Sequence, residues 1–170
     1  AMAVGCYAKD VSGMVDAGVV YYYTRSGSVW TYRSRVISPR AAAGNAFGLG
    51  VKLSQDGNTL YVGEFNGKTN NLTTGALYVF KRNGYAWDFS YEVPEPIYAN
   101  TNRFGIGIGL SGDDSILVVG TDMASEVLTG GGRVNVYIKP STFEQKLLTE
   151  ELTQRSKFYA EDTVAGDYFG

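Results

Sequence analysis

The sequence predicts an all-β fold, a β-propeller of four-stranded antiparallel blades. Glycine and tyrosine are abundant, with 22 and 13 of 170 residues, which favours short strands and tight turns over helices. The chain also repeats: "FGLGVKLSQDGNTLYVG" at 47–63 aligns without a gap with "FGIGIGLSGDDSILVVG" at 104–120. Four strands in a repeat of this length are typical of a propeller blade.

The same offset relates the second halves of the units. "GVVYYYTRSGSVW" at 18–30 aligns with "GALYVFKRNGYAW" at 75–87, and "GALYVFKR" at 75–82 aligns with "GRVNVYIK" at 132–139. "MAVGC" at 2–6 matches "LYVGE" at 60–64 after a slip of a single position. The repeat therefore extends over most of the chain.

Each unit is expected to contain four strands. In the first strand, 104–110, apolar residues alternate with Gly105, Gly107 and Gly109, and we attribute these glycines to an inner strand that neighbouring backbone approaches closely. A short turn, "SQDGN" or "SGDDS", leads to a continuous apolar second strand. The third and fourth strands are joined by "NG" or "SG", and Asn83–Gly84 is a strong hairpin signal. Because a strand follows the glycines where a phosphate loop needs a helix, a nucleotide site is not expected.

The units divide the chain into a partial blade with strands two to four and its connection (1–46), a complete blade (47–103), a second complete blade (104–168), and the start of another (169–170). The third unit is longer than the second, since the interval from Phe104 to Phe169 exceeds that from Phe47 to Phe104. We place this surplus at 149–162 and expect an extended inter-blade loop, or a short helix. Three units indicate part of a larger ring, or a ring completed by oligomerisation.

Composition excludes several functions. The net charge of −2 and the absence of a basic block argue against nucleic acid. There is no histidine, and Cys6 is the only cysteine, so we expect no catalytic residue, no disulfide within the chain and no cysteine-based zinc site. No apolar run is long enough to span a membrane, and the opening residues "AMAVGC" do not have the charged-then-apolar pattern of a signal peptide, so we expect a mature or processed chain or part of a longer protein.

The acidic turns are interpreted as tight turns without metal. Calcium binds about six to eight oxygen atoms, several of them from carboxylates. One turn offers only Asp56, and the other offers Asp113 and Asp114 as neighbours. A calcium site is the alternative interpretation, and no other cofactor is expected.

These blocks resemble the FG-GAP repeat, in the variant found in bacterial and some eukaryotic surface proteins. "FGLGVKLSQDGNTLYVGEF", "GALYVFKRNGYAW" and "EQKLLT" carry the resemblance, which implies a propeller of usually seven blades, as in the head of integrin α-subunits, on an extracellular or particle surface. The chain departs from the family where Glu64–Phe65, Thr121–Asp122 and Cys6–Tyr7 replace its alanine–proline. The alternating acidic residues of integrin-type calcium loops are also absent.

Strand order predicts where a partner would bind. In an up-and-down blade, the short turns share one face, and the long connections share the other; these are 6–17, 38–46, 64–74, 94–103, 121–131 and 149–168. Binding residues tend to lie in such loops. The predicted contact residues are Lys9, Asp10, Glu64, Phe65, Asn66, Tyr98, Arg103, Asp122 and Met123.

Other side chains are given structural or covalent roles. The aromatic residues that recur with the repeat, including Trp30 and Trp87, are expected to pack between blades. Asn71 begins the sequence Asn71–Leu72–Thr73, an acceptor for N-glycosylation in a loop that should be exposed.

The function expected is therefore that of a non-enzymatic adhesion or assembly module, outside the cell or on the surface of a virion or filament. Its partners would be other proteins or surface glycans, besides neighbouring blades or further copies of the chain. Two alternatives remain, a glycan-binding propeller and an accessory propeller of a larger secreted enzyme.

Overall fold

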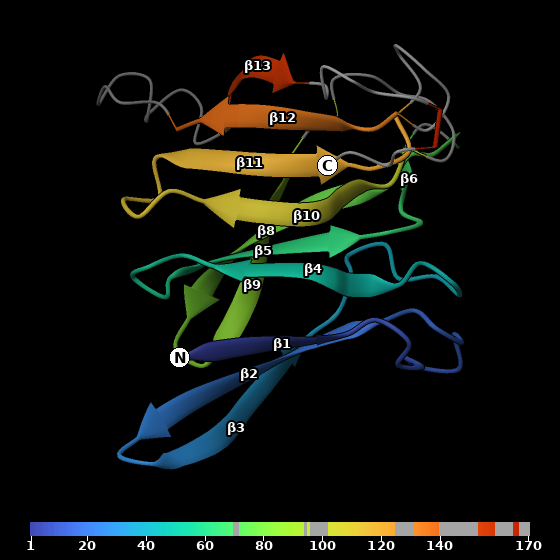
Figure 1. Ribbon diagram of the computed structural model, residues 1–170. Coiled ribbons are helices and arrows are strands. Elements are labelled where there is room, and N and C mark those ends of the chain that lie inside the picture. The colour runs from blue at the N-terminus through green and yellow to red at the C-terminus, as the bar shows by residue number, and fades with distance from the viewer. Residues whose placement is uncertain are drawn as a thin grey trace.

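A computed structural model describes residues 1–69, 72–93, 95, 102–124, 131–139, 153–158 and 165–166. The described part is all-β: it contains strands and turns and no helix, as the sequence predicts. Three antiparallel sheets lie one above the other in Figure 1, and a very short two-stranded sheet accompanies the middle one. Each sheet uses strands that are close together in the sequence.

The first sheet has three strands in the order β1 (Met2–Cys6), β2 (Val19–Ser26) and β3 (Val29–Val36). The tight turn at Gly27, which has a φ of 57°, joins β2 to β3. These are the three strands predicted for the first unit.

The middle sheet has the order β4 (Phe47–Leu53), β5 (Thr59–Glu64), β8 (Ala76–Asn83) and β9 (Ala86–Val93). Its connection 65–75 carries the small hairpin of β6 (Lys68–Thr69) and β7 (Leu72–Thr73), which sequence periodicity did not indicate. The predicted Asn83–Gly84 turn joins β8 to β9, with Asn83 opposite Ala86.

The third sheet has the order β10 (Phe104–Leu110), β11 (Ile116–Thr121), β12 (Arg133–Ile138) and β13 (Thr153–Phe158). Strand β13 corrects our interpretation of 149–162 as an inter-blade loop or short helix, because 153–158 pairs antiparallel with β12. The surplus residues of this unit therefore lie between its third and fourth strands.

Two apolar cores hold the sheets together, and alternate residues of the middle sheet supply both. On one face, Leu60 and Val62 of β5 join Val20 and Val36 of the first sheet. On the other face, Tyr61 joins Phe104 and further residues of the third sheet. Strand β5 is buried along its whole length, so its apolar run without polar alternation follows from having a sheet on each side.

Glycine allows the inner strands to approach one another. A Cβ on Gly5 would lie 1.8 Å from the carbonyl oxygen of Gly48, and one on Gly63 would lie 2.1 Å from that of Gly105. Gly105 itself has a φ of 90°, which glycine adopts without strain. The prediction of a crowded glycine face holds for Gly105, whereas a Cβ on Gly109 would meet only Val118, at 3.7 Å.

The two junctions between sheets have the same geometry. Gly18 forms an isolated parallel bridge with Phe47, and Gly75 forms one with Phe104. Both pairs are related by the constant offset of the sequence repeat. The phenylalanine–glycine motif thus marks the point at which each sheet joins the one before it.

Candidate functional site

Except for the connection between β12 and β13, the described residues of the long connections lie at one end of the sheets, at the right in Figure 1, and the β4–β5 and β10–β11 turns lie at the other end. The long connection between β12 and β13 begins and ends beside the β10–β11 turn, because Ile138 pairs with both Ile116 and Thr153. This corrects the prediction that all long connections share one face. Hydrogen bonds join the long connections to one another: the amide of Gly44 donates to Val15 (2.8 Å), that of Ala46 to Asp16 (3.0 Å) and that of Asn66 to Asn45 (3.0 Å). We call the described residues of 7–18, 37–46, 65–75, 102–103 and 122–124 the loop rim.

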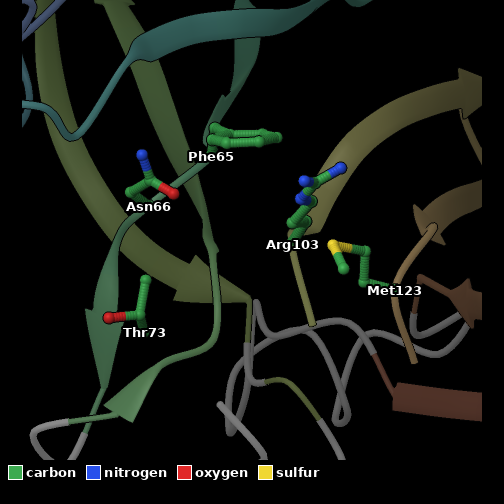
Figure 2. Close-up of a pocket in the computed structure, with 5 residues that line it drawn as sticks. All are labelled: Phe65, Asn66, Thr73, Arg103 and Met123. Atoms are coloured by element: carbon green, nitrogen blue, oxygen red, sulfur yellow. The ribbon is translucent and has the colours of Figure 1, made fainter. Parts of the chain in front are cut away.

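A hollow of about 170 Å³ opens in the loop rim between the middle and third sheets. Figure 2 shows its five lining residues, with the side chains of Phe65 and Arg103 extending toward each other. Phe65 and Asn66 follow β5, Thr73 belongs to β7, Arg103 precedes β10, and Met123 follows β11. Segments that are far apart in the sequence therefore form one surface.

Arg103 is held from two sides. Its guanidinium carbon lies 4.7 Å from the centre of the Phe65 ring, and its Nη1 lies 3.2 Å from Oδ2 of Asp122. The side chain of Asp122 is mostly buried, so this ion pair is better shielded from water than a fully exposed one. The backbone of Arg103 has a φ of 60°, in the left-handed region that favours glycine.

A second hollow of about 480 Å³ adjoins the first, because Phe65 and Asn66 line both. Its wall also contains Tyr7, which is 51% exposed, and the polar residue Asp16. The remaining lining residues are Ala8, Gly44, Ala46 and Leu49. The rim thus offers two aromatic side chains beside amide and carboxylate groups.

Four of the nine predicted contact residues line the first hollow: Phe65, Asn66, Arg103 and Met123. Asp122 acts there through its ion pair with Arg103. Lys9 and Asp10 are exposed in connection 7–18 but line neither hollow. Tyr98 and the predicted glycosylation site Asn71 lie outside the described residues.

Glu64 is placed differently from the other predicted contact residues, because its side chain is fully buried. Its Oε1 accepts a hydrogen bond from Nδ2 of Asn45 (3.1 Å), and its Oε2 accepts one from the hydroxyl of Tyr78 (2.9 Å). Burial raises the pKa of this carboxyl above its ordinary value, against the effect of its hydrogen bonds. Glu64 therefore supports the rim from below and does not present its carboxylate to a partner.

Sequence reasoning missed Thr73 and Leu49 as lining residues. Thr73 enters the first hollow because β6 and β7 fold back as a hairpin, and Leu49 lies on a strand predicted to be interior. The sequence does indicate Tyr7 as a contact residue, because it is an aromatic residue of a long connection and does not recur with the repeat.

At the opposite end, the acidic turns use their carboxylates internally. Asp56 accepts hydrogen bonds from Ser54 (2.6 Å) and the amide of Asn58 (2.9 Å). Asp113 accepts from Ser111 (2.6 Å) and Ser115 (2.7 Å). These bonds lower the pKa of each carboxyl to about 2. Among the described residues, no three acidic, histidine or cysteine side chains form a group suited to a metal ion.

Within the described residues there is also no helix with the length and apolar character needed to cross a membrane. No family model matches the chain, and no curated protein matches it. The sequence repeat and the geometry of the loop rim are therefore the features that bear on function.

Proposed function

We propose that this chain is a section of a β-propeller that acts as a non-enzymatic adhesion or assembly module. The repeated junction supports the propeller, because two successive pairs of sheets meet through equivalent glycine–phenylalanine bridges. Applying one such step again and again generates a ring when the rotation closes. The resemblance to FG-GAP repeats implies the same architecture, usually with seven blades, on an extracellular or particle surface.

The loop rim is the proposed contact surface for a partner protein. One observation carries this proposal: residues of four separate segments in two sheets converge on the hollow beside Phe65. Aromatic residues and arginine are the side chains most often found at the centre of protein interfaces. Phe65 and Arg103 stack there, with Met123 beside them.

Glycan binding is the second candidate. Tyr7 and Phe65 flank the second hollow together with Asp16 and Asn66. Aromatic faces can pack on the apolar faces of sugar rings, and amide and carboxylate groups can hydrogen-bond sugar hydroxyls. This hollow therefore has the chemistry that a surface glycan requires.

Photo-crosslinking in the full-length protein tests the proposal. Tyr7 of the loop rim and Tyr85 of the opposite β8–β9 turn are a matched pair, with exposures of 51% and 55%. We expect benzoylphenylalanine at position 7 to crosslink a partner in the source cells or particles, and the same group at position 85 to give no such product. Peptides from a second protein in the digested adduct would identify a protein partner, and an added mass that glycosidase removes would identify a glycan. Crosslinking from position 85 alone, or from neither position, would contradict a binding function of the rim.

A further inference from the structure

The buried carboxylate of Glu64 connects three elements below the loop rim. Asn45 of connection 37–46 and Tyr78 of β8 donate hydrogen bonds to its two oxygens. The side chain has no exposed surface. Glu64 therefore fixes the position of Asn45 relative to the end of β5.

Asn45 in turn fixes the floor of both hollows. Its carbonyl oxygen accepts a hydrogen bond from the amide of Asn66 (3.0 Å), and Nδ2 of Asn66 donates to the carbonyl oxygen of Gly44 (2.7 Å). Asn66 lines both hollows, and Phe65 lies between Glu64 and Asn66 in the sequence. A change at Glu64 is therefore transmitted through two hydrogen bonds to the turn that carries the proposed contact residues.

The carboxylate of Glu64 differs from the other buried carboxylate in its counterion. Among the described residues, no lysine or arginine forms an ion pair with it. Glu92 of β9 acts on it as a like charge. Arg40, the cation of the adjoining connection, pairs with Glu92 (2.5 Å). Tyr78 of β8 is the remaining titratable neighbour, and its own pKa is strongly raised by burial.

At the junction between the middle and third sheets, the corresponding buried carboxylate has a cation beside it. There, Thr121 occupies the position equivalent to Glu64, and the carboxylate comes from Glu95, which accepts a hydrogen bond from Asn102 (2.9 Å). Arg133 lies 2.8 Å from Glu95, and both side chains are almost completely buried. The carbonyl oxygen of Asn102 accepts a hydrogen bond from the amide of Met123 (3.3 Å), just as the carbonyl oxygen of Asn45 accepts one from the amide of Asn66.

We propose that Glu64 is a proton-dependent positioning residue of the loop rim: when it ionises, the contacts that hold Phe65 and Asn66 in place open more readily. The role of this device in binding rests on the proposed function of the rim, but the opening itself does not. The charged carboxylate is more stable in water than in the closed, uncompensated interior, so ionisation favours the open form.

The direction with pH follows from linkage. Burial raises the pKa of Glu64 in the closed form above the ordinary value of 4.5. At pH values between 4.5 and this raised pKa, the closed form therefore holds a proton that the open form releases. The closed form therefore loses stability as pH rises through this interval, and the opening equilibrium grows by at most about tenfold per pH unit for one proton. Partner binding at the rim is expected to be tighter on the acid side.

Hydrogen exchange in the full chain, resolved to single amides, tests this proposal without a ligand. From about pH 4 to pH 8, the protection factor of the Asn66 amide, corrected for intrinsic exchange, should fall by up to tenfold per pH unit and then level off. The Met123 amide is the internal control and should show no such fall. In Glu64→Gln, a neutral side chain of the same shape, the Asn66 amide should lose its pH dependence.

Three results would overturn the proposal: constant protection of Asn66 in the wild type, an equal fall at Met123, or the same fall in Glu64→Gln. None of these results concerns a partner. A crosslinking experiment that fails beside a positive exchange result would remove the binding function and leave the proton-dependent opening in place.

Discussion

The backbone of Arg103 is strained, and contacts of its side chain offset this strain. A non-glycine residue in the left-handed region is less stable than glycine by about 1 kcal/mol. The ion pair with Asp122 and the stacking on Phe65 offset this cost with about 0.5–1 kcal/mol each. Ala46, at the equivalent position before Phe47, has a similar φ of 55° without such contacts. The positive φ is therefore common to the two junctions, whereas the ion pair and the ring contact are specific to Arg103.

Two variants separate the backbone effect from the side-chain effect. Both Arg103→Ala and Arg103→Gly lose the contacts with Asp122 and Phe65, but only alanine keeps the strain of the positive φ. We expect the glycine variant to have the larger free energy of unfolding, by about 1 kcal/mol, as measured by urea denaturation. Equal stability of the two variants would show that the backbone at this position is not strained.

Protonation of Asp113 should reduce the stability of the folded protein at acid pH. Its hydrogen bonds with Ser111 and Ser115 lower its pKa from 3.8 to about 2. The folded form therefore binds this proton less readily than the unfolded form, so the contribution is present above about pH 4 and is lost as pH falls through about 2. Asp113→Asn should be less stable than the wild type at pH 7, and the difference should vanish near pH 2. A difference that is the same at both pH values would refute this assignment.

Packing of the inner strands depends on residues without side chains. A Cβ at position 63 would lie 2.1 Å from a backbone oxygen of Gly105, which cannot move aside cheaply. Gly63→Ala should therefore reduce the free energy of unfolding by about 3 kcal/mol or more. Gly112, where a Cβ would meet nothing within 4 Å, provides the control, and Gly112→Ala should change stability by less than about 0.5 kcal/mol. Thermal and urea unfolding of both variants measure the contrast, and similar losses would argue against the close approach.

The buried pair of Arg133 and Glu95 makes a different prediction for the second junction. Arg133→Met leaves the Glu95 carboxylate buried without its cation, which should cost about 3–5 kcal/mol of stability. Adding Glu95→Gln removes the uncompensated charge, so the double variant should recover a substantial part of the loss. Urea denaturation gives both values, and a double variant less stable than the single one would contradict this explanation.

The sequence could predict those elements whose pattern repeats. The constant offset between units and a period of two located β4, β5, β10 and β11, and "NG" located the β8–β9 turn. Strand β13 escaped because "TQRSKF" has no apolar alternation, and its place depends on pairing with β12. Local pattern cannot detect a strand that is specified by its neighbour.

The candidate site could be predicted in part, for a related reason. The repeat shows which positions lie in long connections, and this predicted four lining residues of the first hollow: Phe65, Asn66, Arg103 and Met123. The burial of Glu64 could not be read in this way, since it depends on how connection 37–46 folds over the end of β5. Thr73 depends similarly on the β6–β7 hairpin.

The three large sheets do not form independent units. Two apolar cores each lie between neighbouring sheets, and the middle sheet contributes to both. A sheet in this arrangement buries its faces only when a neighbour is present on each side, as in other repeat architectures. The same stacking brings the segments of the loop rim to one end of the sheets, so the architecture that provides stability also assembles this surface.

If equivalent junctions continue in the same way, the sheets form a ring, and its loop rim binds the partner. An electron cryomicroscopy reconstruction of the full-length protein, purified with whatever it binds, would show both the ring and the partner. We expect a closed ring of four-stranded sheets, with additional density on the loop rim beside Phe65 and Arg103. An open stack of sheets, or a partner bound at the edge that carries the Ser54–Asn58 and Ser111–Ser115 turns, would contradict it.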